Sequence, residues 1–315
     1  MTTAAPARVI QPISMADSVM GGRLVVHLEP DGRPDQAVSD ARRVISRIDR
    51  WAARLSRHSA TSDLSALNAD TRSSVPVRPT LASALVAGLV AADASEGFTD
   101  ITLLDARLTA EGLGEDGWAG ASRLSDWQIK TGRRGSASVS RPPGLRFDLG
   151  GVGKGWIADR ALHLMASWPN VLIDADGDLA IRCAPGDCWE IGIDDPRRSS
   201  SQLALLRLQV PSRGVPSRWG VATSGTSIHQ WTVAGTKTHH LIDPRTGRPA
   251  VTDIVQATVI AGSTLRAEAL AKAAVIAGRD AGFALLQRSH AQGAVLLTAT
   301  GEVLALPSTL ELLAA

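Results

Sequence analysis

The sequence is poor in aromatic residues. Among 315 residues it has no tyrosine and only three phenylalanines, although eight tryptophans remain. Proteins that bind single-stranded nucleic acids stack successive bases on aromatic side chains, and the sequence offers little for that purpose. The formal net charge is only +2, and basic residues alternate with acidic ones along the chain. Both observations argue against a nucleic-acid partner.

Cysteines and long apolar runs are equally scarce. The two cysteines, Cys183 and Cys188, have a spacing that matches no metal-binding pattern. We expect both to be small structural residues in a reducing compartment, with a disulfide between them as the alternative. No window of 18 apolar residues occurs, so we expect no membrane-spanning helix and no direct membrane insertion. Residues 1–20 lack a signal-like apolar run and a lipobox-type cysteine, which predicts a cytoplasmic protein.

Helical and strand-like patterns are mixed along the chain without a regular strand–helix–strand repeat. Apolar spacing predicts helices over residues 36–55, 153–165 and 264–277. Such an irregular mixture favours the α+β class. We expect residues 1–17 to form a flexible N-terminus and residues 18–310 to form a single domain. The segments predicted as strands include 24–28, 171–174, 179–183, 189–193, 203–210, 221–223, 240–243 and 255–260.

The most informative segment is a glycine-rich turn between Asp148 and Asp159, with the sequence DLGGVGKGWIAD. Its glycines allow close approach to the backbone, and an N–H-rich turn at a helix start suits an anion. Lys154 would add a positive charge for a phosphate. Neither the Walker motif nor the dinucleotide fingerprint fits, because Gly155 follows Lys154 and Trp156 stands where a glycine is required. The alternative is a tight strand-to-helix connection that binds no ligand.

Four further motifs follow in order. They are an acidic turn at 174–178 (DADGD), a small polar turn at 222–225 (ATSG), the segment 240–247 (HLIDPRTG) and a helical Glu268–Lys272 pair. Each is weak alone, since an acidic turn is usually only a turn and a lone histidine is usually structural.

In this order the motifs resemble the ApbE family of FAD:protein FMN transferases. The family run DLGGxxKGxxxD matches residues 148–159, its ATSG turn matches 222–225, and its HxIDPxTG segment matches 240–247. Its NAGGD turn is similar to residues 174–178, and Met20-Gly-Gly resembles its Met-Gly-Thr opening. Residues 62–68 and 95–98 also resemble family segments. The resemblance covers roughly residues 18 to 300.

The resemblance implies an α+β, T-fold-related domain of mixed sheets with packed helices, which binds FAD with Mg²⁺ on the pyrophosphate. It implies transfer of FMN to a threonine or serine of a partner flavoprotein, membrane redox proteins among them, with release of AMP. His240 and Lys154 would be catalytic, and Gly151, Glu268 and Lys272 stand at the metal positions. The residues implied in flavin and phosphate binding are Met20, Asp148, Gly150, Gly151, Lys154, Asp159, Gly177, Asp178, Thr223, Ser224, Gly225, His240, Ile242 and Asp243.

The chain departs from the family at the metal site, where a late helix carries Glu268 and Lys272 in place of aspartate and threonine. A lysine ammonium has no lone pair to offer a metal. The pair could be an ordinary helical ion pair, or the ammonium could occupy the place of the metal. Both interpretations predict weakened or displaced Mg²⁺.

Two other functions remain open from the sequence: a protein that holds FAD without turnover, and an FAD pyrophosphate hydrolase in which water replaces the hydroxyl. Trp51, Trp118 and Trp231 could stack on a flavin or adenine ring, although a core or rim role is favoured for each.

Overall fold

The computed structural model describes residues 7–114, 126–132, 135–198, 201–233 and 235–313. Its centre is an eight-stranded sheet in the order β18-β17-β16-β11-β8-β7-β3-β2, in which every neighbouring pair is antiparallel. The strands are β2 (Ile13–Val19), β3 (Gly22–Leu28), β7 (Val171–Ala175), β8 (Asp178–Cys183), β11 (Ser217–Gly225), β16 (Ile254–Ala261), β17 (Gly293–Thr298) and β18 (Val303–Ala305).

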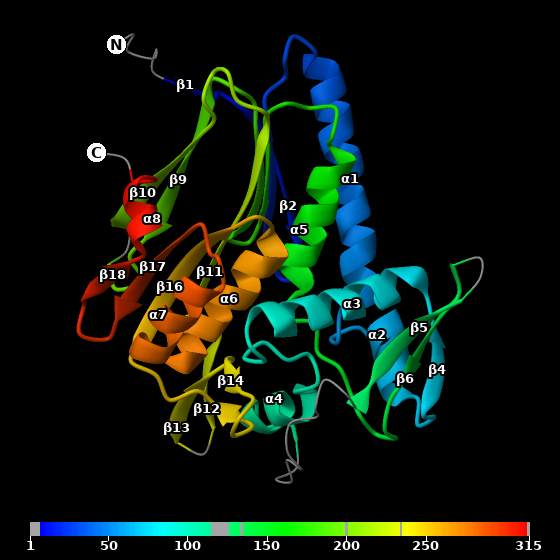
Figure 1. Ribbon diagram of the computed structural model, residues 1–315. Helices are drawn as coiled ribbons and strands as arrows, with labels where there is room; N and C mark the ends of the chain where they lie inside the picture. Colours follow the sequence, from blue (N-terminus) through cyan, green and yellow to red (C-terminus); the bar gives the residue numbers. More distant parts are fainter. Residues whose placement is uncertain (1–6, 115–125, 133–134, 199–200, 234, 314–315) are drawn as a thin grey trace.

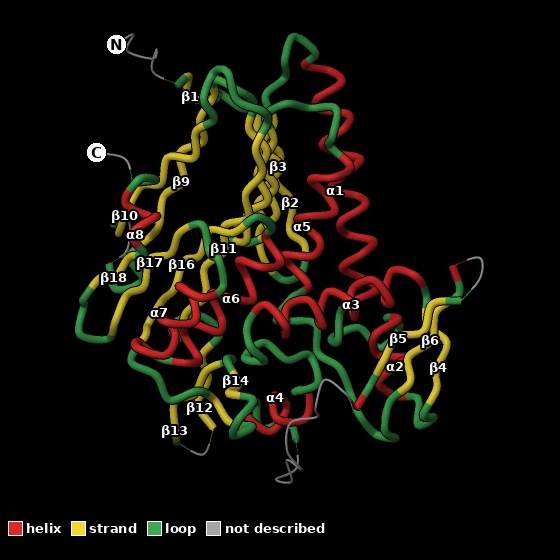
Figure 2. Tube along the Cα trace, in the orientation of Figure 1, coloured by secondary structure: helices red, strands yellow, loops and turns green. Residues whose placement is uncertain are grey.

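Helices cover one face of this sheet, and a second sheet covers the other (Figures 1 and 2). The second sheet has the order β1-β9-β10. Its strands are β1 (Arg8–Val9), β9 (Asp187–Asp194) and β10 (Gln202–Gln209). The helices packed on the first face are α1 (Pro34–Leu55), α5 (Gly153–Leu164), α6 (Thr264–Ala277) and α7 (Arg279–Arg288).

Alternation along β8 shows how the two faces are built. Ala180 belongs to the core cluster shared with α1 and α5, whereas Ile181 and Cys183 belong to the cluster shared with β9 and β10. Because successive side chains of a strand point to opposite faces, Asp178 lies on the helix side with Ala180. The register of β8 therefore directs one carboxylate toward α5 and α6.

Smaller elements surround the end of the large sheet where β8 begins and β11 ends (Figure 1). The sheet β4-β6-β5 packs with α2 and α3, and two short pairs, β12-β13 and β14-β15, lie near α4. Their bounds are α2 (Asp63–Ala69), β4 (Ser74–Val77), α3 (Pro79–Ala94), α4 (Leu104–Ala110), β5 (Gln128–Thr131), β6 (Ala137–Ser140), β12 (Gln230–Val233), β13 (Thr236–His239), β14 (Ile242–Asp243) and β15 (Arg248–Pro249), and α8 (Pro307–Leu310) closes the chain.

The α+β class expected from the sequence is confirmed, with helices and strands in similar proportion. The N-terminal boundary is wrong, because residues 8–9 pair with β9 and residues 13–19 form an edge strand of the large sheet. The strand expected over 240–243 is shorter, since β13 ends at His239 and β14 begins at Ile242. Both cysteines are buried and free. Among the described helices, none is both long and apolar enough to cross a membrane.

Candidate functional site

Two tight hairpin turns lie side by side at one end of the large sheet. Met20 and Gly21 join β2 to β3 with φ of 60° and 75°, and Asp176 and Gly177 join β7 to β8 with φ of 57° and 88°. Positive φ at both central residues is the geometry that matches the twist of a two-residue hairpin. A Cβ at Gly22 would lie 2.4 Å from Cγ of Asp176, so this glycine lets the acidic turn pack over the first hairpin.

The glycine-rich turn is held by its own aspartate. Oδ1 of Asp148 accepts a hydrogen bond from the amide of Gly150 at 2.9 Å, and the carbonyl of Leu149 accepts from Val152 and Gly153. The amide of Gly155 donates to Glu268. Several amides that the sequence suggested for a phosphate are therefore used within the protein. Charge at this turn comes from side chains more than from a free row of N–H groups.

Helices α5 and α6 are joined at this point. The two carboxylate oxygens of Asp159, on α5, accept hydrogen bonds from the amides of Thr264 and Leu265 at 2.9 and 3.0 Å. These amides are among the unpaired donors at the start of α6, so Asp159 caps that helix. This contact explains the last aspartate of the motif without a ligand.

Gly155 permits the close approach of the two helices. A Cβ at this position would lie 2.8 Å from Oε2 of Glu268 and 2.9 Å from backbone atoms of Leu265. No side chain fits there unless α6 moves away. The fourth glycine of the motif is thus required for helix packing.

Two lysines and two carboxylates lie together between α5, α6 and β8. We call Lys154, Asp178, Glu268 and Lys272 the charge cluster. Nζ of Lys154 lies 3.3 Å from Oδ2 of Asp178, and Nζ of Lys272 donates to Oε1 of Glu268 at 2.7 Å. Glu268 is fully buried and Asp178 is 2% exposed. Buried ions must be paired, and the cluster balances two positive and two negative charges.

The pKa values show how strongly these groups act on one another. Burial, reinforced by the Glu268 carboxylate, raises the pKa of Asp178 to about 7 against the opposing effect of the two lysines. Burial alone would lower the pKa of Lys154, but the carboxylates of Asp178, Glu268 and Asp176 outweigh it and the pKa is raised. Lys154 therefore stays charged at neutral pH.

The residues at the expected metal site do not fit a divalent cation. The structure brings Gly151, Glu268 and Lys272 together, since the Lys272 side chain lies 3.8 Å from a Cβ built at Gly151. Both oxygens of Glu268 are already engaged, one by Lys272 and one by the Gly155 amide. In the described part of the chain, no group of three or more His, Cys, Asp or Glu side chains is arranged to hold a metal ion.

His240 lies near this cluster with one ring nitrogen available. Its Nδ1 lies 3.2 Å from the carbonyl oxygen of Ile228. A carbonyl only accepts, so Nδ1 carries the proton and Nε2 has the free lone pair. Burial, together with the positive charges of Lys272 and Arg107, lowers the pKa of His240 to about 3. The imidazole is therefore neutral at physiological pH.

Arg107 and Glu111 support His240, and no motif pointed to them. Arg107 donates to the backbone carbonyl of His240 and lies 4.9 Å above the ring of Trp231. Glu111 pairs with both Arg107 and Arg57, and Arg57 lies 3.8 Å from Asp148. This chain of charges connects His240 to the glycine-rich turn. Sequence reasoning missed it because its members come from separate segments that carry no pattern.

The remaining expected residues have local roles. Thr223 Oγ1 lies 2.8 Å from Thr258 Oγ1 on the neighbouring strand, while Ser224 is buried and Gly225 packs against the Val255 carbonyl. Ile242 packs with Leu103 and Ala106, and Asp243 binds Arg245 and organises the turn that follows. Within the described part of the chain, these contacts are made to residues outside the charge cluster. Trp118 lies outside the described residues.

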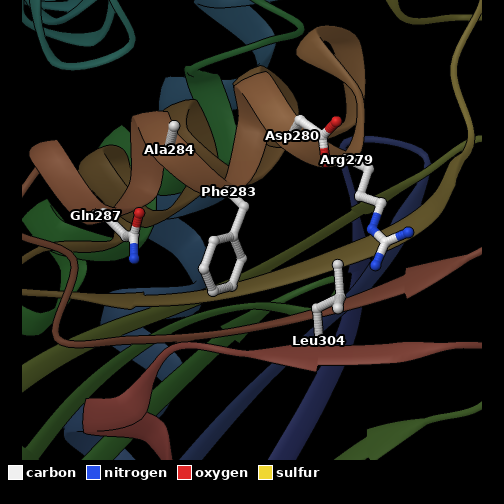
Figure 3. A pocket seen from close by; sticks show the side chains of 6 residues that line it. All are labelled: Arg279, Asp280, Phe283, Ala284, Gln287 and Leu304. Atoms are coloured by element: carbon white, nitrogen blue, oxygen red, sulfur yellow. The ribbon is translucent and has the colours of Figure 1, made fainter.

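Two cavities lie away from the charge cluster. One, of about 270 Å³, is lined by Phe283 and Leu304 between α7 and β18 (Figure 3). The other, of about 430 Å³, lies beside Trp51 and Trp156. The lining of the first contains none of the residues expected at the site. That of the second contains only Asp159, whose oxygens are occupied by α6.

The family model described as the ApbE family matches residues 20–297. The chain belongs to the ApbE family. The resemblance found in the sequence is therefore confirmed, and curated ApbE relatives carry the name FAD:protein FMN transferase. Those from Treponema pallidum and Salmonella typhimurium are 32% and 31% identical over 156 and 158 residues. These matches cover 46% and 49% of this chain but only 41% and 40% of the relatives.

Solved ApbE structures have the same fold. The Thermotoga maritima ApbE protein superimposes with a TM-score of 0.80 at 22% identity, over 97% of this chain and all of the other. The Pseudomonas stutzeri flavinyl transferase ApbE, in its apo form, gives a TM-score of 0.76 at 22% identity, over 97% of this chain and 98% of the other. The expected ApbE-like arrangement of mixed sheets and packed helices is confirmed.

Proposed function

We propose that this protein transfers FMN from FAD to a threonine or serine hydroxyl of a partner flavoprotein and releases AMP. The charge cluster carries the proposal, because it holds two ammonium groups beside the glycine-rich turn. Lys154 belongs to that segment, and the Lys272 side chain lies 3.8 Å from a Cβ built at Gly151. A diphosphate needs positive charge of this kind in a site that excludes water. The names of the relatives support FAD as the source of the diphosphate.

The reaction exchanges one phosphorus–oxygen bond for another. The acceptor hydroxyl oxygen bonds to the phosphorus of the FMN half of FAD, and the bond from that phosphorus to the bridging oxygen breaks. Nε2 of His240 takes the hydroxyl proton, and AMP leaves with the bridging oxygen. Lys154 offsets the charge on the phosphates. Such transfers depend chiefly on positioning and electrostatics.

The low pKa of His240 fits a base that acts only in the complex. In the free protein, Lys272 and Arg107 oppose its protonation. A bound diphosphate brings negative charge next to these cations, which raises the proton affinity of the imidazole. His240 would then accept a proton when substrate is present and remain neutral otherwise.

Lys272 takes the place that a divalent cation would hold. Its ammonium already neutralises Glu268, and a second cation at this point would be repelled. We therefore infer that Mg²⁺ binds weakly and that the protein handles FAD with its own ammonium groups.

A second candidate function is the holding of FAD without turnover. Lys272 favours it, because its ammonium offers hydrogen-bond donors for a phosphate but cannot act as a Lewis acid. Both functions require FAD to bind at the charge cluster, and they differ in whether the diphosphate is cleaved.

The test incubates the purified protein with FAD and a flavoprotein domain that carries a threonine flavinylation site. Transfer predicts flavin fluorescence that stays with the acceptor after denaturation, together with an equal amount of AMP. AMP without an acceptor would instead support hydrolysis. FAD binding with no AMP in either reaction would support the holding function and overturn the transferase.

A further inference from the structure

A cleft of about 430 Å³ lies at the junction of α1, α5 and the start of α6, away from the charge cluster. Its floor is apolar and its rim is basic. Trp51 is half-buried, Trp156 is 5% exposed, and Leu164 is 50% exposed at the edge. The cleft is lined by Trp51, Trp156, Asp159, Arg160, His163, Leu164 and Leu265.

Arg160 places a positive charge next to the apolar floor of the cleft, which suits a ligand with an anionic group beside an apolar one. Its guanidinium lies 4.9 Å from the Trp156 ring centroid and 5.8 Å from that of Trp51, and Nη1 donates to Ser83 at 3.2 Å. The two indole rings meet edge to face at 5.8 Å. Cation–π contacts hold the guanidinium over the rings while its other N–H groups remain exposed to solvent.

A row of arginines continues from the cleft along α1. At 100° per residue, Arg43, Arg47, Arg50 and Arg54 fall within a sector of about 60° that adjoins Trp51. All four are exposed. Helices α1 and α5 lie side by side, so this row and Arg160 belong to one surface (Figure 1). We call it the arginine face, defined by these four residues with Arg160. The row is not evident in the linear sequence, and the one acidic residue between Arg43 and Arg54, Asp49, falls on another side of the helix.

The arginine face is only partly neutralised. Arg43 pairs with Asp40 at 3.1 Å, and Arg54 lies 3.6 Å from Asp63. The ion pairs found among the described residues include neither Arg47 nor Arg50. The centre of the row therefore carries positive charge that has no partner within the described chain.

We propose that the arginine face docks an acidic segment of a partner protein, with an apolar side chain of that segment in the tryptophan cleft. The row from Arg43 to Arg54 spans about 16 Å at 1.5 Å per residue, which exceeds the reach of a small ligand. An extended peptide with spaced carboxylates matches both the length and the charge. The apolar floor accounts for one anchoring side chain. The proposal stands apart from flavin transfer, because none of these residues belongs to the charge cluster.

The experiment uses the full-length protein and a synthetic twelve-residue peptide of alternating glutamate and serine with one central leucine. Binding is followed by tryptophan fluorescence and by anisotropy of a dye on the peptide. The double variant Arg47→Glu/Arg50→Glu should weaken binding by about tenfold or more, and rising salt should weaken the wild type as well. Arg42→Glu is compared with the single variants Arg47→Glu and Arg50→Glu, because it alters the net charge by the same amount and falls about 110° from the centre of the row.

FAD binding is measured for every variant, and we expect it to be unchanged. Equal weakening by Arg42→Glu and by either single variant, Arg47→Glu or Arg50→Glu, would overturn the proposal, because the effect would then reflect net charge alone. So would an absence of peptide binding at low salt. Tighter binding of twelve-nucleotide oligo-dT, or of anionic vesicles, through the same arginines would assign the face to a nucleic acid or a membrane instead.

Discussion

The Lys272 ammonium lies 2.7 Å from Oε1 of Glu268, one helical turn earlier on α6. Glu268 is completely buried and Lys272 is 12% exposed, so this is not a surface ion pair. Exposed pairs of this spacing contribute about 0.3–0.5 kcal/mol, whereas removing one partner of a buried pair costs about 3–5 kcal/mol. The structure thus contains the helical ion pair that the sequence allowed, in a buried position, and the replacement of a metal by its ammonium is our proposal.

Replacing Lys272 with threonine should create affinity for Mg²⁺. The change removes the competing positive charge, adds a hydroxyl oxygen and frees one oxygen of Glu268. In calorimetry with FAD present, we expect Mg²⁺ to bind about tenfold more tightly or better than to the wild type. Lys272→Met is the control, since it removes the charge without adding an oxygen. Tight, stoichiometric Mg²⁺ binding to the wild type would refute the displaced-metal interpretation.

Replacing Lys154 with methionine should weaken both folding and FAD binding. Asp178 would lose its partner at 3.3 Å while remaining 2% exposed. Because its pKa is already about 7, the carboxyl would then stay protonated near neutral pH, and the loss of stability should grow as pH rises above 7. The double variant Lys154→Met/Asp178→Asn removes that buried charge and should recover most of the stability. FAD binding should stay weak in the double variant, measured by flavin fluorescence. Recovery of both properties would show that Lys154 serves only to neutralise Asp178.

Replacing His240 with asparagine should slow transfer by about 10²–10⁴-fold and change FAD affinity little. The prediction depends on the free Nε2, which follows from the contact between Nδ1 and the Ile228 carbonyl. Single-turnover AMP release measures the rate. His290→Asn is the control, because His290 is exposed at a φ of 58° that asparagine tolerates. A wild-type rate in His240→Asn would remove this residue from the reaction.

The same histidine should make the fold sensitive to acid. Its pKa is about 3 in the folded protein, against 6.5 ordinarily. Between these values the unfolded chain binds a proton that the folded chain does not, so stability falls as pH drops below about 6.5. The raised pKa of Asp178 has the opposite effect, because it makes the folded protein more stable as pH falls below about 7. The decisive measurement is therefore the difference between wild type and His240→Asn in urea unfolding at pH 7.5 and pH 5. The variant should lose less stability, by up to about 1.4 kcal/mol per pH unit.

The glycines of the motif should respond unequally to alanine. At Gly155 the new Cβ would meet Glu268 and the Leu265 backbone within 3 Å, and overpacking of this kind costs about 1–3 kcal/mol. At Gly153 the nearest atom is 4.0 Å away, which is ordinary contact. Thermal unfolding should show a marked loss for Gly155→Ala and little change for Gly153→Ala. Equal losses would argue against the proposed helix contact.

Where local pattern determines structure, the sequence was a good guide. The helix expected over 264–277 has those bounds in α6, and the one expected over 36–55 begins two residues earlier at Pro34. The strand expected over 240–243 is shortened to Ile242–Asp243, and His240 instead lies outside it with its imidazole against the Ile228 carbonyl. Periodicity cannot report a contact of this kind, which is set by tertiary packing.

The sequence predicted which residues lie together at the site better than it predicted the contacts that each of them makes. Motif order brought out Lys154, Asp178, Glu268 and Lys272, and the structure places all four together. It did not show that the turn amides are used internally, or that Asp159 faces another helix. Arg57, Arg107 and Glu111 escaped detection because their network forms only when separate segments fold against one another.

Asp159 links α5, which carries Lys154, to the first amides of α6, which carries Lys272. The distance between the two ammonium groups therefore depends on the hydrogen bonds from α6 to Asp159, which involve neither lysine. In Asp159→Glu the carboxylate stands one methylene farther from α5, so α6 and the Lys272 ammonium would shift relative to Lys154. Such a change would alter which anions the protein admits while every ligand-facing side chain stayed the same.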